Sequence, residues 1–204
     1  NWDAVSSGVE VLAREYGWGG AGRLSFAATH SESDHLSGSG FMRRSRSCAV
    51  LDRKGTLIEA ETMMSLLSDH ADGDTDKTNF VTTIDPGKGI CMHYSDGDES
   101  ASTNTAASIV AELCEDGSRL PIYWTSMYSP CLGIFLPTFI EGELPKELSY
   151  AEASASDSSV WWMFRRLAKA VLDSPERRVP EVRTEMTRIQ ANMMKSCYSV
   201  AREG

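Results

Sequence analysis

The expected fold is decided by the stretch Ser129-Pro-Cys-Leu-Gly-Ile-Phe-Leu-Pro-Thr-Phe-Ile-Glu-Gly-Glu-Leu-Pro145. Its apolar part, residues 131–140, has the character of a β-strand, and two similar runs precede it at residues 105–114 and 120–127. Turn-forming residues at 115–118 and at Ser129-Pro130 separate the three runs. Because connections this short join strands that run in opposite directions, we expect an antiparallel sheet.

Further elements are expected on both sides of these strands. Residues 80–84 and 89–94 flank Asp85-Pro-Gly-Lys, which predicts a β-hairpin. Alternating residues predict one more strand at 24–29. Apolar residues at helical spacing predict helices at 5–16, 41–51, 56–70, 160–171 and 182–200, the last two punctuated by Pro175 and Pro180.

The predicted order is helix, strand, two helices, five strands and two helices. This order indicates an α+β fold, in which helices cover a mainly antiparallel sheet, and we expect residues 1–204 to form a single domain. In the helix at 41–51, Phe41, Cys48 and Leu51 are expected to share the buried face, with the arginines outside it. The C-terminal helix is expected to bury a stripe that includes Met193 and Val200.

Composition narrows the functional classes. The formal net charge of −9 opposes binding to nucleic acid, which depends on basic groups. No apolar run is long enough for a membrane span, and no signal peptide is visible. The five cysteines form no C-x-x-C pair, which favours reduced thiols over a disulfide framework or zinc site and leads us to expect a cytoplasmic protein.

Several segments resemble the dipeptidase A and secernin family of N-terminal-nucleophile (Ntn) hydrolases. They are Phe26-Ala-Ala-Thr-His-Ser31, the basic pair Arg43-Arg44, Leu66-Leu-Ser-Asp-His70, the small-residue run 105–113 and the Ser129-Pro-Cys strand, in the order that the family has them. The resemblance extends from about Trp18 to the C-terminal helices. It implies that the chain is the C-terminal portion of a four-layer αββα sandwich.

The resemblance also implies a cysteine nucleophile that is itself the first residue of the mature protein, because its free α-amine acts as the base for its own thiol. This chain begins with Asn1, so we expect that cysteine upstream, in an N-terminal segment or companion chain. The implied substrate is a dipeptide or a related small amide, and no cofactor is implied. Alone, the chain is expected to be inactive.

Three residues are candidates for substrate binding. Arg44, beside Arg43 and Arg46, offers a guanidinium for a peptide carboxylate, although an exposed helix face explains these arginines as well. Asn104 and Ser129 lie at the ends of predicted strands, from which side chains reach a cleft, although such residues also serve to end strand pairing.

Other candidates have simpler explanations. Cys131 lacks an α-amine and is expected to be an inert buried thiol, with an internal-cysteine hydrolase as the remote alternative. No metal site is predicted, because solvated loops explain both the residues around His30 and His35 and the acidic residues 72–76. The pair Trp161-Trp162 is interpreted as core packing.

Two functions therefore remain open at this point. The first is the C-terminal part of a cysteine-type Ntn hydrolase. The second is a noncatalytic, secernin-like module for binding or assembly, which needs no nucleophile. An exposed sheet face would favour association, including formation of a homo-oligomer.

Overall fold

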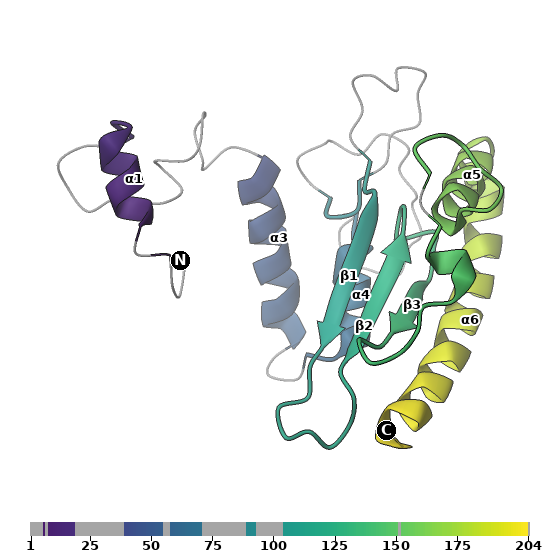
Figure 1. Ribbon diagram of the computed structural model, residues 1–204. Coiled ribbons are helices and arrows are strands. Elements are labelled where there is room, and N and C mark those ends of the chain that lie inside the picture. Colours follow the sequence, from purple (N-terminus) through teal and green to yellow (C-terminus); the bar gives the residue numbers. More distant parts are fainter. Residues whose placement is uncertain are drawn as a thin grey trace.

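The computed structural model describes residues 6, 8–18, 39–54, 58–70, 89–92, 104–150 and 152–203. Within them the chain is α+β, with a three-stranded antiparallel sheet and five α-helices (Figure 1). The helices are α1 (Val9–Glu15), α3 (Ser39–Lys54), α4 (Ala60–Leu67), α5 (Val160–Leu172) and α6 (Pro175–Glu203). The strands are β1 (Ala107–Glu112), β2 (Ile122–Met127) and β3 (Phe135–Thr138). The expected class is thereby confirmed.

The sheet has the order β1-β2-β3, and both pairs are antiparallel. Between β1 and β2 the chain turns at Gly117, whose φ of 66° suits a residue without a Cβ. The third strand is shorter than predicted. Pro130 to Leu132 form a turn, closed by a 3.2 Å bond from the Leu132 N–H to the Ser129 carbonyl, so Cys131 does not lie on a strand.

The predicted strand at residues 89–94 is wrong for the part that the structure describes, 89–92. The backbone N–H groups of Ile90 and Cys91 both donate to the Asp69 carbonyl, at 3.0 and 2.9 Å. These donors therefore serve the segment that follows α4 and not a neighbouring strand. The other half of the predicted hairpin and the strand predicted at 24–29 lie outside the described residues.

Two helices differ from the predicted pattern of burial. In α3, Cys48 is exposed, and Arg46 is half-buried because its guanidinium pairs with Asp69 of the neighbouring segment. In α6, Pro175 holds the first helical position, which suits a residue without a backbone N–H, and Pro180 lies inside the helix. Its buried residues are Val179, Met194, Cys197 and Ala201, and Val200 is exposed.

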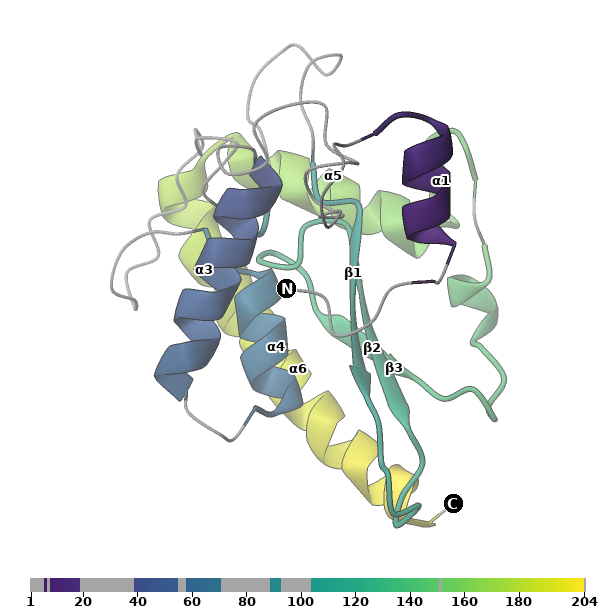
Figure 2. The same cartoon turned by 90° about the vertical axis from the view of Figure 1, so that its left-hand side faces the viewer.

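The main core lies on one face of the sheet, under α4 and α6. Figure 2 shows both helices on the same side of the strands. Trp124 and Ile122 of the central strand are fully buried there. The other buried members of this core are Ala60, Met64, Val110, Phe135, Met194, Cys197 and Ala201. The hydrophobic burial of this face holds α4 and α6 against the sheet.

The opposite face of the sheet is much less covered. Ala107, Ile109 and Ala111 of β1 are exposed, and Ile109 lies directly opposite Thr125 in the register. On β2 and β3 the side chains of this face are only half-buried; they are Tyr123, Thr125, Met127, Leu136 and Thr138. The sheet is therefore one-sided in the part of the chain that the structure describes.

Candidate functional site

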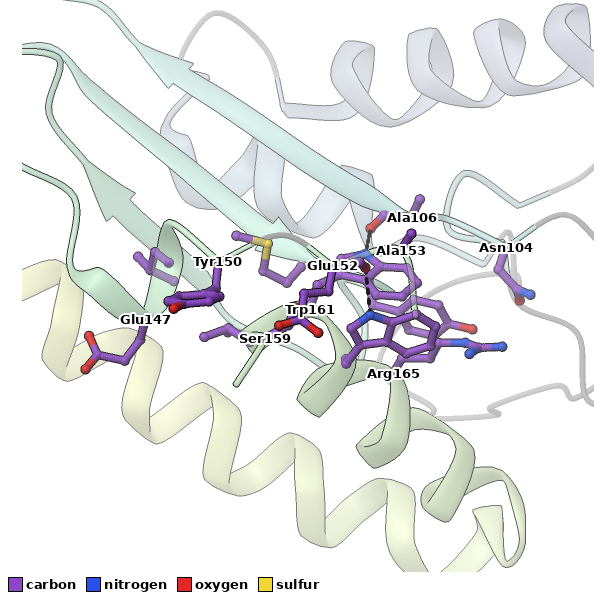
Figure 3. Close-up of a pocket in the computed structure, with 14 residues that line it drawn as sticks. Asn104, Ala106, Glu147, Tyr150, Glu152, Ala153, Ser159, Trp161 and Arg165 are labelled. Carbon is purple, nitrogen blue, oxygen red and sulfur yellow. Dashed lines mark hydrogen bonds between the residues drawn. The ribbon is translucent and has the colours of Figure 1, made fainter. Parts of the chain in front are cut away.

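A pocket of about 730 Å³ lies where β1 begins and β2 ends, between the sheet and the first turns of α5 (Figure 3). Strand ends, the segment before α5 and α5 itself contribute its walls. The side chains on which its chemistry depends are Asn104, Tyr128, Glu147, Glu152, Trp161 and Arg165, with Trp162 and Tyr150 completing an aromatic lining. Its volume is in the range of sites for small molecules.

Hydrogen bonds hold the two indole rings in place. The Ala106 carbonyl accepts from Trp161 Nε1 at 2.7 Å and also from the Tyr128 backbone N–H at 2.9 Å. Trp162 Nε1 donates to the Glu152 carbonyl at 3.0 Å (Figure 3). The two indoles meet edge to face, with ring centroids 4.9 Å apart. A rigid aromatic wall of this kind is preorganised for a ligand, since little side-chain entropy is lost on binding.

Tyr128 has a backbone conformation that is unusual for its size. Its φ is 65°, in the left-handed region that a bulky side chain rarely enters. The ring packs edge to face against Trp161 at 5.4 Å, which helps to retain this conformation. Strain of this type costs of order 1–3 kcal/mol and is concentrated at functional sites, so its position in the pocket wall supports a binding role.

The pocket also brings charges of both signs close to the aromatic rings. The Arg165 guanidinium lies over the Trp162 ring, 4.8 Å from its centroid, in a cation–π contact. Glu147 and Glu152 line the same pocket. A small molecule with a carboxylate, an ammonium group and an apolar side chain would find a complementary group for each part.

Only one of the three residues predicted from sequence to bind substrate lines this pocket. Asn104 lines the pocket. Ser129 is buried, and its Oγ has no hydrogen-bond partner among the described residues; Arg44 is exposed on α3. Neither Ser129 nor Arg44 lines this pocket.

Sequence reasoning missed the aromatic wall. The interpretation of Trp161-Trp162 as core packing is wrong, because both side chains are half-buried and line the pocket. One signal was present: two adjacent tryptophans cannot both face the same apolar stripe of a helix. In α6, Met193 was predicted on the buried stripe but is only half-buried, and its neighbour Met194 belongs to the core instead.

A second cluster of reactive groups lies apart from the pocket lining. His70, Cys91 and Cys131 are all buried, and their potential ligand atoms lie within 4.8 Å of one another. A hydrogen bond from the Cys131 thiol and further stabilisation by His70 lower the pKa of Cys91 to about 5, against the opposing effect of burial. Burial, and then the hydrogen bond with Cys91 and the charge on Cys91, raise the pKa of Cys131.

The surroundings of Cys131 argue against this residue as an internal nucleophile. A buried thiol with a raised pKa has little thiolate and little access to substrate, which agrees with its interpretation as unreactive. Cys91 is also fully buried. All five cysteines are free thiols in this structure. The candidate ligands His30 and His35 and the acidic residues 72–76 lie outside the described residues.

Comparison with known proteins adds no relative: no family model, curated protein or solved structure matches this chain. Among the described helices, none combines the length and apolar character needed to cross a membrane. The chemistry of the pocket and of the buried cluster is therefore the basis for assigning function.

Proposed function

We propose that this chain is part of a cysteine-type Ntn hydrolase that acts on dipeptides or related small amides. In this proposal the nucleophilic cysteine comes from a segment outside residues 1–204, and the chain contributes one sheet, its covering helices and one wall of the substrate pocket. The proposal rests on one observation, an aromatic and charged pocket at the rim of a sheet that the described residues cover mainly on one face.

An αββα sandwich requires a sheet face that its own helices leave open, and the described residues cover one face of this sheet much less than the other. In that architecture each sheet carries helices on its outer face and packs its inner face on the second sheet. Here α4 and α6 cover the face that contains Trp124, whereas Ile109 on the other face is 61% exposed. A second sheet packed on Ile109 and its neighbours would bury this surface and would close the pocket from that side.

The pocket chemistry is compatible with a dipeptide. Its volume of about 730 Å³ accommodates two residues, and the indoles offer apolar surface for a side chain. We assign the peptide carboxylate to Arg165, because a guanidinium matches a carboxylate with two parallel hydrogen bonds. The peptide ammonium is assigned to the side of Glu147 and Glu152, which carry the opposite charge.

The alternative is a noncatalytic binding or assembly module. The same pocket would then bind its ligand without bond cleavage, and the same open face would pair with a partner. Binding to this chain is expected under both proposals, so turnover by the complete polypeptide distinguishes them.

Binding is tested with Arg165→Gln in the 204-residue chain. Isothermal titration calorimetry would compare dipeptides with the same dipeptides amidated at the C-terminus. If Arg165 binds the carboxylate, Arg165→Gln weakens dipeptide binding by about 10- to 100-fold, the equivalent of one charged hydrogen-bonded contact. Amidation should then cost the wild type a similar factor and the variant almost nothing.

Arg166→Gln is the matched control. Arg166 is the next residue of α5 and pairs with the exposed Asp157 at 3.1 Å, and it does not line the pocket. Equal weakening by both substitutions, or no dipeptide binding at all by the folded chain, would rule out the assigned carboxylate site.

Catalysis is tested in the polypeptide that the complete gene encodes. Dipeptide turnover, N-terminal sequencing of the mature protein and substitution of any N-terminal cysteine by alanine would be measured together. The hydrolase proposal requires turnover that disappears with that cysteine. Ligand binding without turnover, or a mature protein that lacks such a cysteine, would favour the noncatalytic module.

A further inference from the structure

Three segments far apart in the sequence bring together the buried side chains of His70, Cys91 and Cys131. His70 follows the C-terminal end of α4, Cys91 lies in the segment 89–92, and Cys131 lies in the turn between β2 and β3. Their exposed fractions are 8%, 0% and 6%, so water has little access to any of them. The imidazole nitrogen and the two Sγ atoms all lie within 4.8 Å of one another.

The backbone around this cluster is held by its own contacts. The Asp69 carbonyl accepts the N–H groups of Ile90 and Cys91, which places Cys91 beside the residue that follows Asp69, His70. The Asp69 carboxylate is bound in turn by two nitrogens of Arg46, at 2.8 and 2.6 Å. These contacts connect α3, the end of α4 and the segment 89–92.

The third member, Cys131, is held by a contact with α6. Arg183 of α6 donates from Nε to the Cys131 carbonyl at 3.2 Å. Around the cluster, Cys91 and Cys131 pack with the apolar residues Leu132, Ala168, Val171 and Val179, and with the partly buried Tyr128, Leu167 and Val182. Three potential ligands are thus supported by a surrounding shell, as in protein metal sites.

We propose that His70, Cys91 and Cys131 bind a zinc ion. Two thiolates and one imidazole form a ligand set that zinc prefers, whereas calcium and magnesium require oxygen. A tetrahedral zinc with Zn–S bonds of about 2.3 Å holds two sulfurs about 3.8 Å apart, so the two sulfurs need to close by at most about 1 Å. The three side chains fill three of the four tetrahedral positions, and a single water molecule enclosed with the ion fills the fourth.

The role of this zinc is structural, because all three ligand side chains are buried. The ion would connect the end of α4, the segment 89–92 and the β2–β3 turn. It would also anchor Tyr128, which packs against this cluster and lines the pocket. The zinc site does not depend on the proposed hydrolase activity, because it involves different residues and has its own measurements.

The test uses the 204-residue chain, purified without chelators and without a metal-affinity column. Elemental analysis should find one zinc per chain, and removal of zinc with a chelator should lower the thermal unfolding midpoint, with recovery on addition of Zn²⁺. Co²⁺ in place of zinc should give thiolate-to-cobalt charge-transfer absorption and the strong visible bands of tetrahedral coordination.

Substitutions then identify the ligands. Cys91→Ser and Cys131→Ser should each lose stoichiometric zinc and the stabilisation by Zn²⁺, and His70→Gln should lose the tetrahedral cobalt bands. Cys48→Ser is the matched control, since Cys48 is an exposed thiol on α3 and should retain zinc. Zinc retained by Cys91→Ser and Cys131→Ser together would overturn the proposal.

A measurement on the unsubstituted chain covers the case in which these variants fail to fold. Zinc should protect Cys91 and Cys131 from alkylation, as read by peptide mass spectrometry, while Cys48 reacts with or without zinc. Unchanged alkylation of Cys91 and Cys131 with Zn²⁺ present, or a Cys91–Cys131 disulfide in the freshly purified chain, would refute the zinc site.

Discussion

Replacement of Ile122 by alanine tests the one-sided sheet on which the proposed function depends. Ile122 lies on the central strand, β2, and is 0% exposed. It belongs to the core beneath α4 and α6. Because the side chain is completely enclosed, its truncation removes buried apolar surface and leaves a cavity that the surrounding strands and helices can fill only in part.

The expected loss follows from this burial. Substitutions of a buried isoleucine by alanine cost about 2–5 kcal/mol, and we expect about 3 kcal/mol for Ile122→Ala. For a chain of this size, 1 kcal/mol corresponds to about 2–4 °C in the unfolding midpoint. The variant should therefore unfold about 6–12 °C below the wild type.

Ile109→Ala is the matched comparison, with the same residue type changed on the neighbouring strand. Ile109 faces the opposite side and is 61% exposed, so its loss should cost about 0.5 kcal/mol, mostly from strand preference. Urea unfolding followed by tryptophan fluorescence and by circular dichroism would give both values. Coincident transitions would show that a single free energy of unfolding applies.

Equal losses in the free energy of unfolding for Ile109→Ala and Ile122→Ala would refute the conclusion that the sheet is covered mainly on one face. If Ile109→Ala costs as much as Ile122→Ala in this chain, the β1 surface is covered and is not available to a second sheet. In the complete polypeptide, by contrast, the proposed function predicts that Ile109→Ala becomes costly, because the second sheet would bury it.

Three further predictions concern contacts within the fold. Burial, reinforced by a hydrogen bond to a carboxylate, raises the pKa of Tyr198, so folding favours the protonated phenol. The contribution of this phenol to the free energy of unfolding is complete below about pH 10 and declines as the pH rises above that value. Urea midpoints measured across that range should show that Tyr198→Phe removes this part of the alkaline loss of stability. Gln190→Ala should cost about 1–3 kcal/mol in urea unfolding, because the buried Phe135 loses partners for both its N–H and its C=O. Arg46→Gln should cost a similar amount, measured in the same way, because it breaks a two-bond contact with the mostly buried Asp69, and the loss should shrink in high salt.

Each of these has a control or a contradicting outcome. An unchanged alkaline decline in Tyr198→Phe would show that this phenol is not the titrating group. Asn192→Ala changes an exposed position on α6 and should be nearly neutral, so an equal loss there would show that Gln190 has no special role. Arg44→Gln, on the exposed face of α3, should likewise leave stability unchanged and separates the Arg46 contact from a general effect of charge.

The local sequence pattern predicted β1 and β2 well but misplaced the start of β3. Alternation and turn residues were sufficient to place β1 and β2, because a strand with one buried face has a period of two in its sequence. The same reasoning extended β3 to Cys131, although the strand begins at Phe135. An apolar run does not reveal where a turn takes over, because the residues of the turn from Pro130 to Leu132 are buried as well.

The local sequence pattern did not reveal which residues from distant segments meet in the pocket and in the buried cluster. Asn104 was placed at a strand end and does line the pocket, but Arg165 and the indole of Trp161 reach the same place from a helix more than fifty residues later. His70, Cys91 and Cys131 follow no ligand spacing, so sequence reasoning favoured the absence of a metal site. Distances between such residues depend on the packing of separate elements.

The sequence by itself determined the α+β class, the antiparallel strands and the helix periods, because these follow from local spacing and composition. Only the tertiary structure decided which face of the sheet is covered, which side chains form the pocket and which thiols meet an imidazole. The physical reason is that burial is a collective property: the free energy that joins α4, the β2–β3 turn and α6 arises from surfaces removed from water together, and no single segment encodes its partners.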